Sequence, residues 1–268
     1  MSISEGAVAA AAGSRLCFAD LLQALRAGWS DFLAAPAYGL FFAAFYVLGG
    51  WVILAAFTQA GLFWLIMPAG AGFPILGPFI AVGLYEVSRR LQNGLPLNPA
   101  QVLGVIWAQK NRQIPSMAVV VVVFFLFWNF LAHMIFALFM GLSVMTNISS
   151  SPEVFLTPNG LAMLGLGTAV GAVFAGVLFA ITVFGLPMLL DREVDFVTAM
   201  ISSWAAVAEN PVVMLCWGAF IAMLLFIAML PGFLGLFVVL PLLGHATWHL
   251  YKRWSDGAGL EFPHASDV

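Results

Sequence analysis

The stretch from Pro115 to Met140, PSMAVVVVVFFLFWNFLAHMIFALFM, contains no charged residue. About 20 apolar residues in a helix are enough to cross the hydrocarbon layer of a bilayer, so this stretch predicts a transmembrane helix. The whole chain of 268 residues has the same character, with 63% apolar and 8% charged residues. A soluble domain carries about 25% charged residues. The composition therefore predicts an integral membrane protein, and nine basic residues are too few for a nucleic-acid surface.

The intervals between charged residues indicate how many helices cross the bilayer, because a charge at its centre costs roughly 2.5 to 3.5 kcal/mol. The long charge-free intervals are 32–85, 113–152, 154–190 and 210–251. The first and last are long enough for two crossings, and the other two for one crossing each. The sequence therefore predicts an all-α membrane protein with six transmembrane helices as three hairpins, near 36–58, 73–91, 115–143, 160–190, 211–230 and 233–252.

The segment from Thr58 to Pro78 fits this pattern least well. Its prolines and glycines, among them Pro68 and Pro74, interrupt or weaken the hydrogen bonding of a helix. Three interpretations stay open for it: an outer loop, a re-entrant segment and a broken helix.

The lysines and arginines indicate the orientation. With six crossings, all nine fall on one side of the membrane, whereas an odd number would scatter them over both sides. The positive-inside rule then places both termini in the cytoplasm. The sequence predicts a disordered cytoplasmic tail over 1–17, a single membrane domain over 18–254 and a second cytoplasmic tail over 255–268.

A short amphipathic helix is predicted before each hairpin. In the first, apolar residues such as Phe18, Leu25 and Trp29 recur at helical spacing, with polar residues between them. Similar segments follow Asn98 and begin near Val197, and they contain Trp107 and Trp204. Because tryptophan favours the membrane interface, we expect all three helices to lie flat in the headgroup layer.

The three hairpins also share a pattern of prolines. A proline follows each of these tryptophans after seven or eight residues, at Pro36, Pro115 and Pro211. We interpret the chain as three repeat units, at about 18–91, 99–193 and 194–254. The alternative is that aromatic ends and proline turns are common to any membrane hairpin.

Four motifs are distinctive: Arg26-Ala-Gly-Trp29-x-Asp31, Pro36-x-Tyr38-Gly39, Phe73-Pro-x-Leu-Gly-Pro78 and Gly83-Leu-Tyr85-Glu86-x-Ser88-Arg89-Arg90. They resemble an uncharacterised family of predicted bacterial multi-pass integral membrane proteins, a domain of unknown function. The resemblance covers most of the chain, and the last motif is its most specific part. It implies a bacterial inner membrane, and it implies no established activity.

Four polar residues within the predicted spans are candidates for a functional site. Asn129 and His133 share one face of an apolar helix, where they could take part in a proton step or hold an axial ligand, or could bond a neighbouring helix. His245 and His249 have the i, i+4 spacing of some metal ligands. They also lie close to Lys252, which favours an alternative role as interfacial anchors.

No other pattern in the sequence predicts chemistry. No nucleophile stands beside a base in a known motif, and no pair of carboxylates lies within a predicted span. Glu86 and Asp191 stand beside basic residues, where ion pairing or hydration explains them. We therefore expect no enzyme, no catalytic residue, no bound metal and no cofactor.

Two functions remain after these exclusions. The first is an accessory or assembly factor of a larger membrane complex, whose partners would be the lipid bilayer and other membrane subunits. The alternative is a small transporter or channel. Because the predicted spans hold few polar residues, its solute would have to be apolar or weakly polar.

The predicted topology can be tested with a cysteine at Ser150, in a variant whose Cys17 and Cys216 are replaced by serine. The loop after the third helix is predicted to face outward. We therefore expect a membrane-impermeant maleimide to label this cysteine in intact cells. Labelling that requires permeabilised cells would contradict the six-helix topology.

Overall fold

The computed structural model describes residues 15–58, 66–109, 112–141 and 155–258, so most of the predicted N-terminal tail lies outside the described residues. The elements are all helices, which confirms the all-α prediction. They are α2 (Phe18–Ala34), α3 (Pro36–Thr58), α4 (Ile66–Gln92), α5 (Pro99–Gln109), α6 (Ile114–Met140), α7 (Pro158–Thr182), α8 (Gly185–Asp191), α9 (Phe196–Glu209), α10 (Pro211–Met229) and α11 (Leu236–Ala258).

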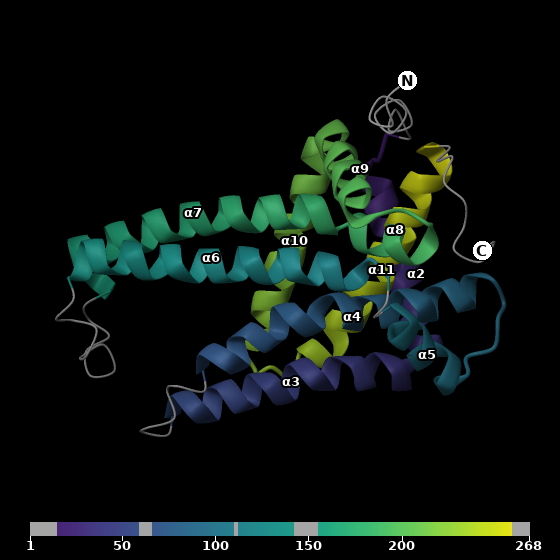
Figure 1. The fold of residues 1–268 in the computed structure, drawn as a ribbon, viewed down its shortest axis with the longest axis horizontal. Coiled ribbons are helices and arrows are strands. Elements are labelled where there is room, and N and C mark those ends of the chain that lie inside the picture. The colour runs from purple at the N-terminus through teal and green to yellow at the C-terminus, as the bar shows by residue number, and fades with distance from the viewer. Residues whose placement is uncertain (1–14, 59–65, 110–111, 142–154, 259–268) are drawn as a thin grey trace.

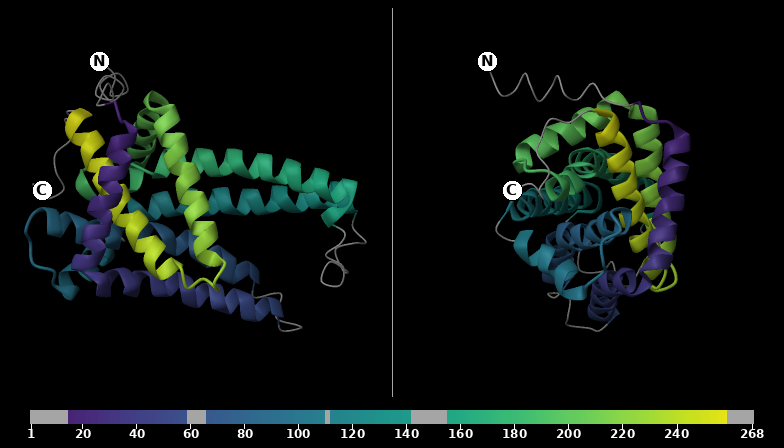
Figure 2. Two further views of the ribbon diagram at one scale, coloured as in Figure 1. Left: turned by 180° about the vertical axis from the view of Figure 1, so that it is seen from behind. Right: turned by 90° about the vertical axis from the view of Figure 1, so that its right-hand side faces the viewer.

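Two sets of helices run in different directions (Figure 1). The pairs α3 with α4 and α6 with α7 lie along the long axis of the molecule, and α4 contacts α6. Helices α2, α10 and α11 run across this axis, as Figure 2 shows from behind, and α11 contacts both α2 and α10. The two sets are therefore not parallel to a single membrane normal.

Within the described residues, four helical segments are long and apolar enough to cross a membrane: Pro36–Ala55, Ile114–Met140, Pro158–Asp191 and Pro211–Met229. This agrees with a multi-pass protein, but the six spans in three hairpins are not confirmed. The other two predicted spans correspond to α4 and α11, helices of 27 and 23 residues. The glycines and prolines of α4 and the polar end of α11 make both less apolar than the other four.

The segment that the sequence left open is helical from Ile66 onward. Helix α4 continues through Pro74 and Pro78 to Gln92, so residues 66–78 are neither a loop nor a broken helix. The reason is local: each proline removes one N–H donor, but the remaining backbone bonds continue the helix on either side. At the other end of the chain, α11 extends to Ala258, four residues into the predicted tail.

The predicted fourth span over 160–190 falls within the candidate span Pro158–Asp191, but this segment bends where α7 ends and α8 begins. The side chain of Ser203 lies at the break. Its hydroxyl accepts the N–H of Phe184 (3.1 Å) and donates to the carbonyl of Ala180 (2.6 Å). In an unbroken helix these two backbone groups would bond each other, so Ser203 replaces that bond and permits the bend.

Helix α9 turns large apolar residues outward. Its Ser202 and Ser203 are buried, whereas Ile201 and Trp204 are 53% and 49% exposed. Helix α2 is mixed, because Asp20, Leu21 and Phe32 are buried while apolar Leu22 and Trp29 are exposed. The arrangement in α9 is the reverse of that in a protein surrounded by water.

Helix α2 packs closely along α11 because Gly28 has no side chain. A Cβ at this position would lie 2.6 Å from the backbone nitrogen of Ala246. The antiparallel pair is held at one end by the ion pair of Asp20 with Arg253 and farther along by His249 Nε2 and Asp31 Oδ2, 2.7 Å apart. The two ends of the described chain are thus joined to each other.

Replacement of Gly28 by leucine tests this contact. The added side chain would overlap the backbone of α11, so we expect a loss of about 1 to 3 kcal/mol in stability, as for other overpacked sites. Thermal unfolding in detergent measures the loss. Ala19→Leu on the exposed face of the same helix is the control, and equal unfolding temperatures for the two variants would contradict the proposed close packing.

Candidate functional site

The C-terminal end of α4, all of α8 and the second half of α11 meet in a buried region that contains several polar groups. We call it the polar junction and define it by Glu86, Ser88, Asp191, His245 and Tyr251, all of which are buried. These residues belong to three helices that are far apart in the sequence: α4, α8 and α11. The region is therefore the candidate for a functional site.

Glu86 provides the anionic centre of the junction. Its side chain is 0% exposed and pairs with Arg89 Nε (2.7 Å) and Arg90 Nε (2.7 Å). Arg90 also donates to Gln101 Oε1 (2.7 Å), which connects α4 to α5. A buried carboxylate is stable only when it is paired in this way, so the sequence interpretation of Glu86 as an ion-pair residue is confirmed.

Asp191 plays a similar part at the end of α8. It accepts a hydrogen bond from the hydroxyl of Tyr251 (2.9 Å) and lies 3.5 Å from Lys252 Nζ. Both partners belong to α11, and Arg192 Nε lies 3.3 Å away on the other side. Ion pairing therefore explains Asp191 as well.

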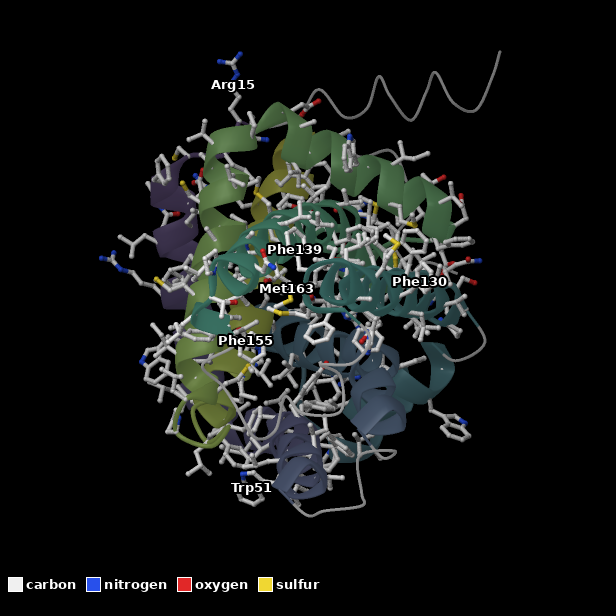
Figure 3. All side chains as sticks on the ribbon, turned by 90° about the vertical axis from the view of Figure 1, so that its left-hand side faces the viewer. Arg15, Trp51, Phe130, Phe139, Phe155 and Met163 are labelled. Atoms are coloured by element: carbon white, nitrogen blue, oxygen red, sulfur yellow. The ribbon has the colours of Figure 1, made fainter. Side chains whose placement is uncertain are left out.

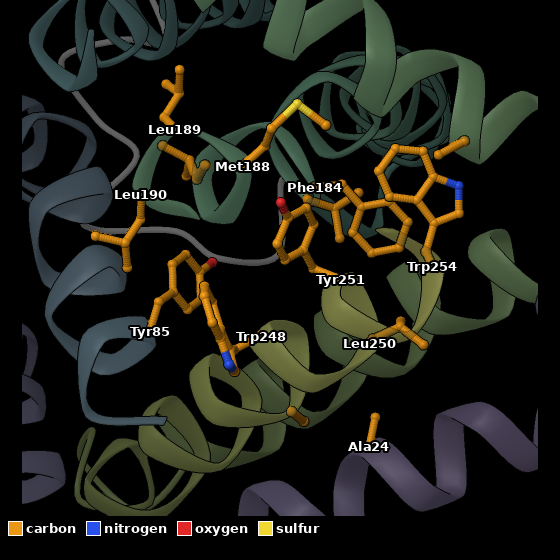
Figure 4. Packing of buried hydrophobic residues seen from close by; sticks show 14 of the residues in the cluster. Ala24, Tyr85, Phe184, Met188, Leu189, Leu190, Trp248, Leu250, Tyr251 and Trp254 are labelled. Carbon is orange, nitrogen blue, oxygen red and sulfur yellow. The ribbon is translucent and has the colours of Figure 1, made fainter. Parts of the chain in front are cut away.

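A row of aromatic rings lines this part of α11 (Figure 4). Trp248, Tyr251 and Trp254 follow one another along the helix, with Tyr85 of α4 stacked on Trp248 at 6.3 Å and Phe184 stacked on Trp254 at 5.2 Å. Ring contacts of this kind add roughly 0.5 to 1.5 kcal/mol each to the area that they bury. They hold α11 firmly between α4 and the segment before α8.

The predicted pair His245 and His249 is not brought together as a metal site. His245 Nδ1 and Ser88 Oγ lie 2.8 Å apart, whereas His249 bonds Asp31 of α2. Among the described residues, no group of three or more potential ligands could hold a metal ion. The two histidines instead connect α11 to two different helices.

The contact between Ser88 and His245 resembles a nucleophile beside its base. Both side chains are 0% exposed, however, and neither lines the two cavities described below. A substrate would have no access to the hydroxyl. The arrangement favours a structural hydrogen bond between α4 and α11.

Asn129 and His133 bond within their own helix. Asn129 Nδ2 donates to the carbonyl of Phe125 (2.9 Å), and His133 Nδ1 donates to the carbonyl of Asn129 (2.7 Å). The sequence had left open a hydrogen bond to a neighbouring helix, and neither of these two bonds is of that kind. His133 is exposed on the outer side of α6, so nothing in its surroundings points to a ligand.

Asp20 and Asp195 are acidic groups outside the predicted spans whose pKa values are lowered. Desolvation raises the pKa of Asp20, but hydrogen bonds from Cys17 and the charge of Arg253 outweigh this effect. Hydrogen bonds from the side chain and backbone of Thr198 lower the pKa of Asp195, which caps α9. Their contribution to stability is thus present at neutral pH and is lost only as the pH falls through the acidic range.

Two of the cavities among the described residues are lined in part by α4. One has a volume of about 650 Å³ between the α3–α4 pair and the α6–α7 pair. The other, of about 200 Å³, lies between α4, α10 and α11. Tyr46 and Gly77 line both. Their linings are largely apolar, which suits an apolar molecule better than a polar substrate.

Sequence reasoning identified the charged residues of the junction but missed Ser203 and the bond of Ser88 to His245. The motif from Gly83 to Arg90 did contain a signal, because nearly every residue in it has a specific contact. A Cβ at Gly83, for example, would overlap the ring of Phe42. The motif did not indicate which distant residues would complete these contacts.

Comparison with known families covers the α4 and α8 residues of this junction but not those of α11. Residues 66–191, from the start of α4 to the end of α8, match the family described as "Predicted integral membrane protein (DUF2189)", whose function is unknown. The match includes the motifs at 73–78 and 83–90 and confirms the resemblance to an uncharacterised family of integral membrane proteins over these residues, whereas the motifs at 26–31 and 36–39 lie outside it. No match is found among curated proteins or among solved structures.

Two substitutions test the importance of the buried ion pairs. Glu86→Gln leaves two arginines without a buried counter-charge, so we expect a loss of about 3 to 5 kcal/mol in stability. Glu193→Gln is the control: Glu193 pairs with Arg112, each with about one third of the side chain exposed, and such pairs contribute about 0 to 1 kcal/mol. Unfolding in detergent measures both variants, and equal losses would contradict a special role for Glu86.

Proposed function

Since residues 66–191 belong to this family of predicted integral membrane proteins, we propose that the chain is a six-span protein of a bacterial inner membrane, with both termini in the cytoplasm. We further propose that it carries out no covalent chemistry and serves as an accessory or assembly factor of a larger membrane complex. The three repeat units, each with an interfacial helix before a hairpin, are part of this proposal.

The charges and exposed faces support the proposed topology. Basic residues that the positive-inside rule assigns to the cytoplasm gather at one end of the helices, in and around the polar junction, as the pairs of Arg89, Arg90 and Lys252 indicate. The exposed apolar residues of α9, and exposed residues of α2 such as Leu22 and Trp29, suit the headgroup layer. In this topology α10 and α11 are tilted relative to the other two hairpins.

The proline pattern supports the repeat. Helix α3 begins at Pro36 and α10 at Pro211, and α6 has a proline in its first turn, so each proposed outward span starts in the same way. Each follows a shorter helix that ends only a few residues earlier: α2, α5 and α9.

The observation that carries the accessory function is a stripe of small residues on α7 that no other helix in the described part of the chain covers. Gly165, Ala169, Ala172 and Gly176 have the 4-3-4 spacing of one helix face, and all four are exposed. A Cβ at Gly165 or Gly176 would have no neighbour within 4 Å. Small residues of this kind allow two membrane helices to approach closely, so the stripe suits a helix from another subunit.

The position of the α6–α7 hairpin makes this face accessible. The hairpin extends beyond the other helices (Figure 1), and Phe139 and Met163 lie near its end in Figure 3. By contrast, Gly171 of the predicted Gly-x-x-x-Gly step faces inward, where a Cβ would lie 3.0 Å from the Trp128 ring. One side of α7 thus packs within the chain while the stripe remains available.

Purification in a mild detergent tests the proposal. We expect the tagged full chain to bring down a membrane subunit in a fixed ratio. The double variant Ala169→Leu, Ala172→Leu should lower this recovery about tenfold, because the added side chains prevent the partner helix from approaching α7 closely. A tenfold change corresponds to roughly 1.4 kcal/mol of binding free energy.

The matched control for this experiment is Ala219→Leu, Ala222→Leu. These two alanines are also exposed and three residues apart, but they lie on α10. We expect the control to retain the partner. Recovery of the unmodified chain without any partner would contradict the accessory function.

The cavity of about 650 Å³ favours the second candidate, a small transporter or channel for an apolar or weakly polar solute. Its lining would offer little to a polar solute. A transporter would move its solute across vesicles that contain only this protein, whereas an accessory factor would show no such activity in isolation.

A further inference from the structure

The cavity between the two long hairpins is shaped for a ligand rather than for water. Its volume of about 650 Å³ falls within the range of roughly 300 to 1,000 Å³ that is typical of ligand pockets. It is lined from five helices, with residues that include Tyr46 of α3, Pro78 of α4, Phe124 of α6, Phe174 of α7 and Leu186 of α8.

Aromatic side chains form one wall of the cavity. Phe174 contacts Phe124 and Trp128, with ring centroids 6.1 and 5.9 Å apart. These contacts connect α6 to α7 across the cavity wall. Gly171 and Ala175 on α7 also line the space, so the wall has large rings beside positions with almost no side chain.

The lining excludes an ionic occupant. None of the lining residues carries a charge, and the hydroxyl of Thr182 already donates to the carbonyl of Leu178 (2.7 Å). Burial of an unpaired ion or amide in such a site would cost several kcal/mol. Burial of a hydrocarbon carries no such cost. The part of the ligand that enters the cavity is therefore neutral and apolar.

A smaller cavity of about 200 Å³ lies beside α10 and α11. Tyr46 and Gly77 line both cavities. A Cβ at Gly77 would lie 2.9 Å from the Tyr46 hydroxyl oxygen, so these two residues are close together where the two cavities adjoin.

We propose that the larger cavity binds a single acyl chain from the surrounding bilayer. Three of the helices that line the larger cavity, α3, α6 and α7, are candidate spans, so the medium around it is lipid. The acyl chain lies against Phe124, Trp128 and Phe174, and its end points toward Tyr46 and Gly77. This binding site is independent of the partner helix proposed for α7, because it lies on another face of that helix.

Photo-crosslinking of the purified full chain tests this binding site. The two probes are palmitic acid and a phosphatidylethanolamine, each with a diazirine on the acyl chain. We expect labelled peptides from 121–128 and 171–182, and unlabelled oleic acid should reduce this labelling. Labelling by the free acid identifies a fatty acid as the source of the chain, and labelling by the phospholipid alone identifies a membrane lipid.

Ala175→Phe fills the cavity, and we expect it to lower the labelling about tenfold or more, since even single methylenes change binding in apolar pockets by about that factor. Val173→Phe is the matched control, because this exposed residue on the same helix does not line the cavity. If Ala175→Phe does not fold, Val121→Phe fills the same space from α6. Labelling that spreads evenly over outward residues such as Phe130 and Leu215, and that persists in the filled variants, would overturn the proposal.

Discussion

A bilayer offers no hydrogen-bond partner to a polar group in its interior, and this constraint organises the whole molecule. Ser202 and Ser203 of α9 turn inward, whereas Ile201 and Trp204 of the same helix turn outward. In the polar junction, the buried carboxylates of Glu86 and Asp191 are paired. The same constraint makes Ser203 important, because backbone groups that are released at a helix break in this setting need another partner.

The structure combines a firmly packed end with an end that is largely open to its surroundings. The core gathers the large aromatic residues of α11 with parts of α2, α4, α8, α9 and α10. Away from it, α6 and α7 extend as a pair with apolar faces, and side chains such as Phe130 and Trp51 point outward in Figure 3. The rigid end suits a fixed scaffold, and the extended hairpin suits contact with lipid or with another membrane helix.

The sequence predicted those features that depend on local composition. Runs without charge located the apolar helices, and neighbouring arginines explained Glu86 in advance. Features that depend on distant partners were not predictable: the bond of Ser88 to His245 joins residues 157 positions apart. The sequence also placed Ser203 on a polar face without showing that this face would be buried. The length of helix α4 was underestimated, because its prolines suggest an interruption of the helix that the backbone does not contain.

The close packing of α2 against α11 has a consequence for biosynthesis. Helix α2 is the first described helix to leave the ribosome and α11 is the last, so Gly28 meets Ala246 only after nearly all of the chain has been made. Until then, the nascent protein must keep α2 at the membrane surface without its permanent neighbour. A chain that stopped before α11 would lack the contact that brings its two ends together. Quality-control proteases could recognise such a chain by the α2 helix that lacks α11 as its packing partner.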